Sequence, residues 1–226
     1  MSTFYFIRKL RNYACFVSFY YPCPILVFVR MKYFLLTFFK VLRYYLFINM
    51  FKRFIPFAHA ASIYEIPVDF YQQNGVTLLL IDLDNTLDSY RLYTPTERAV
   101  SLIASIRAAN ITPVIISNNR GKRVSSYANA LGLEYIHSAR KPFSGKIKKF
   151  LKEKNVPLEN VMFVGDQMVT DVLAAKGAHL RIVLTEKIVK EDQFTTHFNR
   201  LIDRPIRKHL RKKGKVPDWR TKYGQM

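Results

Sequence analysis

Carboxylates that could attack phosphorus or share a metal ion occur in a short motif after an apolar run. Asp82 and Asp84 lie two residues apart in the segment Asp82–Thr86. Residues two apart in an extended segment point to the same face, so both carboxylates can reach one site. Their mutual repulsion is relieved by a divalent cation or a shared proton. One carboxylate can then act as a nucleophile while the other handles the proton, which indicates phosphoryl transfer.

Three further motifs carry groups that suit the same chemistry. Ser117 and Asn118 follow an apolar run, where a hydroxyl and the following backbone N–H groups can hold a phosphoryl oxygen. Lys141 offers an ammonium that can neutralise charge on the transferring group. Asp166 is placed to ligate Mg²⁺, with Asp171 behind it in a supporting position.

Simpler interpretations exist for each of these residues. A calcium loop beginning at Asp82 is excluded, because its sixth position is Leu87 and not Gly, and its twelfth is Tyr93 and not Glu. Asp166 could instead cap a helix. Lys141 could be a solvated lysine and Ser117 a turn residue. We expect Thr86 to support the loop by hydrogen bonding.

Strand and helix signals alternate through the middle of the chain. Apolar runs predict strands at 76–83, 112–117, 134–137, 160–164 and 180–184. Helical patterns lie between them, at 94–109, 119–131, 144–154 and 170–176. For the first helix we expect Thr94 as N-cap, Pro95 at the first position and Glu97 closing a capping box. The alternation predicts a three-layer α/β domain with a mainly parallel sheet, whose active site gathers at the carboxyl ends of the strands.

The chain is strongly basic. Its 226 residues contain 36 Lys and Arg against 16 Asp and Glu, a formal net charge of +20. This excess favours an anionic partner, such as phosphate groups, an acidic membrane surface or nucleic acid. The two cysteines, Cys15 and Cys23, indicate neither a disulfide framework nor a cysteine zinc site, and we expect a reducing interior.

Composition divides the chain into three zones. Residues 1–49 are rich in aromatic and aliphatic side chains and contain Lys and Arg but no acid. This extension is either a membrane anchor or upstream sequence that is not native protein, with translation starting at Met50 or Met31. Residues 50–202 have the composition of a globular domain. Residues 203–226 form a basic C-terminal tail, which we expect to be solvated or to contact lipid or RNA.

The order of these motifs resembles the haloacid dehalogenase (HAD) superfamily of phosphatases over about 76–185. The chain resembles its YqeG-type, subfamily IIIA members more closely than the superfamily as a whole. The residues that carry this resemblance are Met50–Pro56, Ser62–Tyr64, Asp82–Leu87 and Gly165–Gln167. Asp88 departs from the pattern, because such sequences more often have an apolar residue there.

This resemblance implies a Rossmann-like fold, Mg²⁺ dependence and a set of roles. Asp82 would be the nucleophile and Asp84 the acid/base. Ser117 and Lys141 would bind the phosphoryl group, and Asp166 would be a metal ligand. In the mechanism that we expect, Mg²⁺ is held by Asp82, Asp166 and the backbone carbonyl of Asp84, and Asn118 is a further substrate-binding residue.

The intervals between the motifs leave no room for a cap domain, so we expect a site open to large substrates. The resemblance extends to capless phosphatidylglycerophosphate phosphatases, which makes a lipid headgroup at an anionic membrane the leading substrate. We therefore expect a cytoplasmic protein that acts at the inner face of the membrane. The alternatives are a phosphatase of nucleotides, sugar phosphates or nucleic-acid ends, and a non-catalytic RNA- or ribosome-binding protein.

Overall fold

Six parallel strands form the sheet that organises the domain. The computed structural model describes residues 51–189 and 194–223, with the backbone alone at 194–201. The strand order is β1-β6-β5-β2-β3-β4, and every neighbouring pair is parallel. The strands are β1 (Ala58–Ala60), β2 (Leu78–Asp82), β3 (Thr112–Ile116), β4 (Glu134–Ile136), β5 (Val161–Gly165) and β6 (Arg181–Thr185).

Continuous apolar runs form these strands because both faces of the sheet are covered. In β2, Leu79 and Ile81 enter one buried cluster, whereas Leu78 and Leu80 enter the other. This alternation follows from the two-residue period of an extended chain. The sheet therefore separates two hydrophobic cores, and every residue of β2 and β5 is buried.

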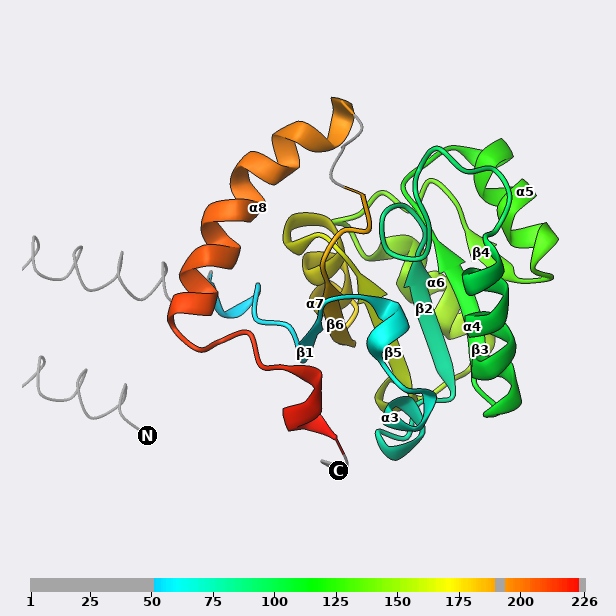
Figure 1. Ribbon diagram of the computed structural model, residues 1–226, viewed down its shortest axis with the longest axis horizontal. Coiled ribbons are helices and arrows are strands. Elements are labelled where there is room, and N and C mark those ends of the chain that lie inside the picture. Colours follow the sequence, from blue (N-terminus) through cyan, green and yellow to red (C-terminus); the bar gives the residue numbers. More distant parts are fainter. Residues whose placement is uncertain (1–50, 190–193, 224–226) are drawn as a thin grey trace, which may run out of the picture. The chain divides into compact units, whose positions relative to one another are not determined.

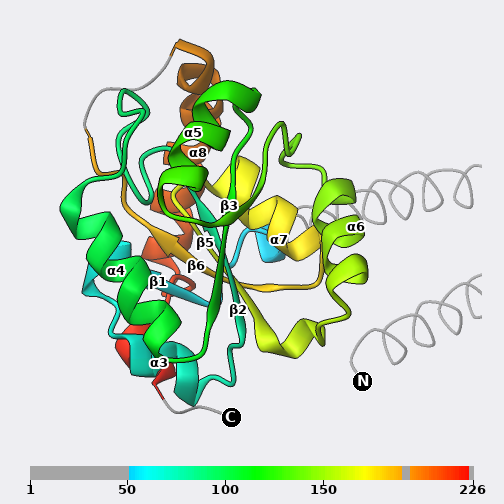
Figure 2. The ribbon, with the colours of Figure 1, turned by 90° about the vertical axis from the view of Figure 1, so that its right-hand side faces the viewer.

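Helices cover both faces of the sheet, which gives the predicted three layers (Figures 1 and 2). Side chains of α3, α4 and α5 pack into one core, and those of α6, α7 and α8 pack into the other. Their bounds are α3 (Val68–Gln73), α4 (Glu97–Ala108), α5 (Gly121–Ala130), α6 (Gly145–Lys154), α7 (Leu173–Gly177) and α8 (Phe194–Lys212). The α/β, Rossmann-like fold class is thus confirmed, and none of the described connections between strands contains an inserted cap domain.

The chain reverses its direction across the sheet at β2. From β2 it proceeds through β3 to β4 on one side, then crosses to β5 and β6 on the other side. In open parallel sheets the crevice at such a switch point is where ligands bind, outside the carboxyl ends of the strands. The loop after β2 lies at the end of the sheet opposite to α3 (Figure 1).

The first predicted helix begins later than expected. The N-cap of α4 is Thr96 and not Thr94, and its Oγ1 accepts a hydrogen bond from the backbone N–H of Ala99 at 3.4 Å. The reason is Asp88, whose carboxylate accepts hydrogen bonds from the N–H and the hydroxyl of Thr96 at 3.0 Å each. These bonds fix Thr96 at the helix start.

The basic C-terminal segment is folded onto the domain, which differs from the expected solvated tail. Residue 203, where the tail was expected to begin, lies inside α8. Asp203, Leu210 and Trp219 are buried, and Leu210 and Trp219 belong to opposite cores. A short 3₁₀ helix, η4 (Trp219–Lys222), follows α8.

The extension expected at 1–49 lies outside the described residues. None of the helices in 51–189 and 194–223 combines the length and apolar character needed to cross a bilayer.

Candidate active site

A buried lysine joins two carboxylates at the carboxyl ends of the strands. The Nζ atom of Lys141 lies 2.5 Å from Oδ1 of Asp82 and 2.7 Å from Oδ1 of Asp171. Asp82 is the last residue of β2, Lys141 follows β4, and Asp171 lies in a π-helical turn, η3 (Met168–Val172), after β5. The parallel sheet thus brings together three charged groups that are far apart in sequence.

Asp82, Asp166 and Asp171 form a cluster of buried carboxylates. Each offers one oxygen, and these oxygens all lie within 4.8 Å of one another. Three carboxylates and the single ammonium of Lys141 would leave a net charge of −2. Mg²⁺ prefers carboxylate oxygens and supplies the charge that balances this excess, so the donor set fits the ion.

The electrostatics of the cluster also favour a bound cation. Burial raises the pKa of the Asp82 carboxyl well above its ordinary value, and the charge of Lys141 opposes this while Asp171, Asp166 and Asp84 add to it. Burial lowers the pKa of Lys141, but the facing carboxylates of Asp171 and Asp82 outweigh burial and raise it overall. Lys141 is therefore a cation in the folded protein, and the carboxylates require more positive charge than it provides.

The side chain of Asp84 lies outside this cluster. Its Oδ2 accepts hydrogen bonds from the Ser117 hydroxyl at 2.9 Å and from the Asn119 amide at 3.0 Å, and its Oδ1 pairs with Arg123. These three donors hold the carboxylate on the β3 side of the site. Of the groups on Asp84, this leaves the backbone carbonyl for a metal, which is the atom assigned to that role above.

Asn118 and Thr86 support the charged residues. The Asn118 amide accepts a hydrogen bond from the Lys141 N–H at 2.7 Å and donates one to the Lys141 carbonyl at 3.0 Å. Asn118 thereby fixes the backbone of Lys141, and its role in binding substrate stays a prediction. The hydroxyl of Thr86 donates to Oδ2 of Asp82 at 3.0 Å, which orients that carboxylate.

A glycine gives Asp171 its place in the cluster. A Cβ atom added to Gly165 would lie 2.7 Å from the Cβ, Cγ and Oδ2 atoms of Asp171, closer than real Cβ atoms approach. The N–H of Gln167 donates to Oδ2 of Asp171 at 2.9 Å. The turn after β5 thus requires glycine before Asp166, and it turns Asp171 back toward Lys141.

Helix α8 reaches the same turn through two side chains. Arg207 donates from its guanidinium to the carbonyl of Asp166 at 2.6 Å and to Glu186 at 2.9 Å. Asp203, one helical turn earlier, accepts a hydrogen bond from the N–H of Val169 at 3.0 Å. The C-terminal helix therefore contacts the backbone on both sides of the start of η3.

Glu186 links β6 to β1 and α8. Its carboxylate lies 2.7 Å from Nε2 of His59 and also pairs with Arg207 and Arg211. The hydrogen bond with His59 and the charges of the two arginines outweigh burial and lower the pKa of Glu186 from 4.5 to about 2. This acid is therefore ionised at neutral pH and holds α8 to the end of the sheet.

The unusual Asp88 has a structural role in this loop. It is fully buried, and besides Thr96 it accepts a hydrogen bond from the Tyr127 hydroxyl at 2.5 Å. Its backbone carbonyl accepts from the N–H of Asn85 at 2.8 Å, which closes the loop after Asp84. An acid at this position thus fastens the loop after β2 to α4 and α5.

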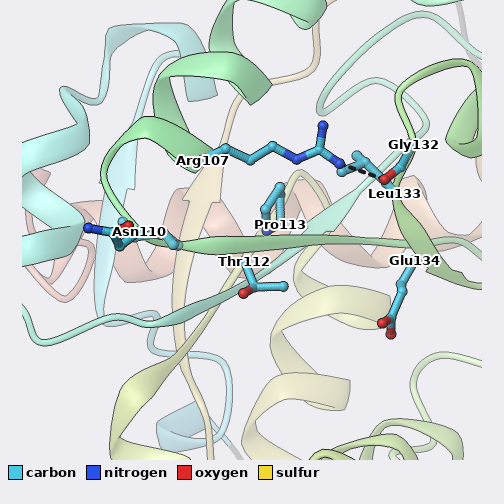
Figure 3. Close-up of a pocket in the computed structure, with 8 residues that line it drawn as sticks. Arg107, Asn110, Thr112, Pro113, Gly132, Leu133 and Glu134 are labelled. Atoms are coloured by element: carbon cyan, nitrogen blue, oxygen red, sulfur yellow. Dashed lines mark hydrogen bonds between the residues drawn. The ribbon is translucent and has the colours of Figure 1, made fainter.

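The hollow in Figure 3 lies elsewhere. It encloses about 430 Å³ and is lined by residues such as Arg107, Thr112 and Glu134. Thr112 and Glu134 begin β3 and β4, so the hollow lies at the amino ends of these strands. Its lining includes none of the active-site residues described above.

Three residues of the site were not predicted from the sequence. Arg123 pairs with Asp84, while Asp203 and Arg207 contact the turn at Asp166. Asp203 and Arg207 are four residues apart and so share a helix face with Leu210, a pattern that an amphipathic reading of this segment would have found. For Arg123 the sequence offers no comparable signal.

The chain is similar to one curated protein and to several solved structures. A probable phosphatase, YqeG, of Bacillus subtilis (strain 168) is 29% identical over 165 residues, which cover 73% of this chain and 96% of that protein. Among solved structures, 3-deoxy-D-manno-octulosonate 8-phosphate phosphatase from Yersinia pestis is 19% identical, covers 53% of this chain and 77% of its own, and has a TM-score of 0.40. The enzyme of the same name from Moraxella catarrhalis, in complex with magnesium, phosphate and a KDO molecule, is 16% identical over 44% of this chain and 63% of its own, with a TM-score of 0.35.

The family model for haloacid dehalogenase-like hydrolases matches residues 43–179. That range is more than half of the chain and contains Asp82, Ser117, Lys141, Asp166 and Asp171. The chain belongs to the haloacid dehalogenase-like hydrolase family.

Proposed function

We propose that this hydrolase is a phosphatase that passes the phosphoryl group of a phosphomonoester to Asp82 and then to water. The observation that carries the proposal is the convergence of Asp82, Asp166 and Asp171 around the ammonium of Lys141. A carboxylate is a suitable nucleophile because the acyl phosphate that it forms is readily hydrolysed. The relative from Bacillus subtilis, itself described as a probable phosphatase, supports the same reaction class.

In the first step an oxygen of Asp82 attacks phosphorus, and the bond from phosphorus to the leaving oxygen breaks. Asp84 gives its proton to that oxygen, and Ser117 and Lys141 bind the phosphoryl oxygens. In the second step Asp84 takes a proton from water, which attacks phosphorus and frees Asp82. Arg123 and Ser117 hold the side chain of Asp84 in place for both proton transfers.

Phosphatases of this family depend on Mg²⁺. The carboxylates of Asp82, Asp166 and Asp171 and the carbonyl of Asp84 would hold the ion, which would neutralise charge on the phosphoryl oxygens. Asn118 and Thr86 keep Lys141 and Asp82 in position.

We infer that the substrate is phosphatidylglycerophosphate, which the enzyme converts to phosphatidylglycerol. Two features support a lipid headgroup. The described connections hold no cap domain, so the site can accept a phosphate at a surface. The formal net charge of +20 favours contact with an anionic bilayer.

Phosphate release from a panel of esters, with and without Mg²⁺, tests the reaction class and the substrate together. The panel contains phosphatidylglycerophosphate, a sugar phosphate, a nucleotide and a 5′-phosphorylated oligonucleotide. We expect Mg²⁺-dependent release from the lipid above all. If phosphate is released only from one of the other esters, that ester becomes the proposed substrate. If no ester releases phosphate, the phosphatase assignment fails and a non-catalytic binding protein becomes the better proposal.

The Asp82→Asn variant tests the nucleophile. We expect phosphate release to fall by more than about a thousandfold while the fold stays intact by circular dichroism, because removing a covalent nucleophile has effects of at least this size. Glu153→Gln, an exposed substitution on α6, is the control and should retain full activity. Retained Mg²⁺-dependent hydrolysis by Asp82→Asn would count against the mechanism.

A further inference from the structure

Exposed apolar side chains lie in two loops at the carboxyl end of the sheet. Leu92 and Tyr93 follow β2 and are 36% and 61% exposed, and Phe143 follows β4 and is 74% exposed. Large apolar side chains exposed next to one another indicate an interaction site more often than scattered ones do. Loops after parallel strands meet at one edge of the sheet, so these side chains share that edge with Asp82.

Hydrogen bonds tie both loops to the catalytic residues. Arg123 pairs with Asp84 and also donates from its Nε to the carbonyl of Leu92 at 3.1 Å. The N–H of Phe143 donates to the carbonyl of Arg140 at 2.9 Å, which closes a turn that contains Lys141. Leu92 is therefore bonded to the partner of Asp84, and Phe143 lies two residues after Lys141.

The same loops present cations without exposed acids. Arg91, Arg120 and Arg140 are exposed in the connections after β2, β3 and β4. The acids in these connections are Asp84 and Asp88, and both are engaged, Asp84 with Arg123 and Asp88 with Thr96 and Tyr127. The edge of the site is thus both apolar and positively charged. We call this surface the catalytic rim: Arg91, Leu92, Tyr93, Arg120, Arg140 and Phe143.

We propose that the catalytic rim seats the active site on a bilayer that contains anionic phospholipid. This inference rests on the proposed function, because a lipid phosphomonoester would then reach Asp82 while its acyl chains stay in the bilayer. Aromatic and aliphatic side chains enter the interfacial layer of a membrane, and each Arg or Lys near an anionic surface strengthens binding to it.

Nucleic acid is the other polymer that a basic, aromatic surface can bind. Bases would stack on Tyr93 and Phe143. Leu92 has no aromatic face for stacking, however, whereas it suits the interfacial layer of a bilayer. The mixture of aliphatic and aromatic side chains with arginines therefore favours the membrane surface.

Tryptophan fluorescence tests the rim independently of catalysis. The chain has one tryptophan, Trp219, which is buried. In full-length protein, Phe143→Trp adds a reporter to the rim, and Leu158→Trp adds one at an exposed apolar position in the connection before β5. Each variant is mixed with phosphatidylcholine vesicles, with or without phosphatidylglycerol, and with a single-stranded RNA oligonucleotide.

We expect the emission of Phe143→Trp to shift to the blue with phosphatidylglycerol vesicles and to be quenched by brominated lipid. Leu158→Trp and the parent protein should show neither change, even if another part of the chain binds the vesicles. An unchanged Phe143→Trp spectrum, or equal shifts in both variants, would overturn the inference. A shift with RNA and none with vesicles would overturn it in favour of nucleic acid.

Phosphate release by the same proteins separates this inference from the proposed function. If the panel of esters yields phosphate but Phe143→Trp reports no lipid contact, the rim inference fails and the phosphatase stands. If Phe143→Trp reports lipid contact and no ester is hydrolysed, the rim inference holds and the proposed function fails.

Discussion

At the scale of single residues, the site depends on one ammonium placed among buried carboxylates. Lys141 contacts Asp82 and Asp171 directly, and Asn118 fixes its backbone. Breaking such a buried pair from one side costs about 3–5 kcal/mol, because an uncompensated charge remains. Lys141 therefore contributes to folding, besides the phosphoryl binding that we propose for it.

Gly165→Ala tests how tightly Asp171 is held. Because the new Cβ would overlap Asp171, that carboxylate must move away from Lys141. We expect turnover to fall at least about tenfold and the free energy of unfolding to fall by about 1–3 kcal/mol, as for other overpacked sites. Both are measured, by phosphate release and by urea denaturation.

Gly145→Ala is the matched control, because a Cβ at that position meets no atom within 4 Å. It should keep the activity and stability of the parent protein. Equal activity in Gly165→Ala and Gly145→Ala would show that the position of Asp171 is unimportant for catalysis.

At the scale of elements, α8 contributes to the site although its basic sequence did not predict this. The basic residues from Asp203 onward predicted a solvated tail, but Asp203, Arg207 and Leu210 share a face that packs on the domain. The strands were easier to predict, because a continuous apolar run such as the one ending at Asp82 is typical of a buried parallel strand.

Arg207→Met tests the link between α8 and the turn at Asp166. The substitution removes the donor to the Asp166 carbonyl and the partner of Glu186. We expect a loss of about 1–3 kcal/mol in unfolding free energy, the usual cost of buried groups left without partners. We also expect half-maximal activity to require more Mg²⁺, because Asp166 is held less firmly.

Lys208→Met changes the neighbouring, exposed residue and should alter stability by no more than about 0.5 kcal/mol. If Arg207→Met matches Lys208→Met in both urea midpoint and Mg²⁺ requirement, then α8 does not position the turn.

The pH dependence of stability tests the cluster of His59, Glu186, Arg207 and Arg211. The pKa of Glu186 is lowered from 4.5 to about 2, so its stabilising contribution is present above about pH 4.5 and is lost as the pH falls toward 2. We expect Glu186→Gln to be less stable than the parent protein at neutral pH. Because Glu186 is half-buried, solvent screening keeps this difference modest.

Urea midpoints of the two proteins, measured between about pH 7 and about pH 3, check the sign. The gap between them should stay constant down to about pH 5 and narrow below that. A gap that widens as the pH falls would contradict the assignment of Glu186 as an ionised partner of α8.

At the scale of the whole molecule, the sheet order is what makes a site from distant segments. β2 lies between β3 and β5, so the groups after these strands meet where the chain reverses direction. The sequence predicted the fold class and the motifs at the strand ends. It could not predict that Asp84 turns toward Arg123 or that Asp171 joins Asp82 and Asp166, because both depend on side-chain contacts between elements.

The most direct test of the proposed mechanism is to trap the phosphorylated residue during turnover. Acid-quenched enzyme is reduced with borohydride, which converts an aspartyl phosphate to homoserine, and peptide mass spectrometry locates the change. We expect homoserine at Asp82, and none at that position in the Asp82→Asn variant. Homoserine at another aspartate, or none at Asp82 while phosphate is released, would contradict the assignment of Asp82 as the nucleophile.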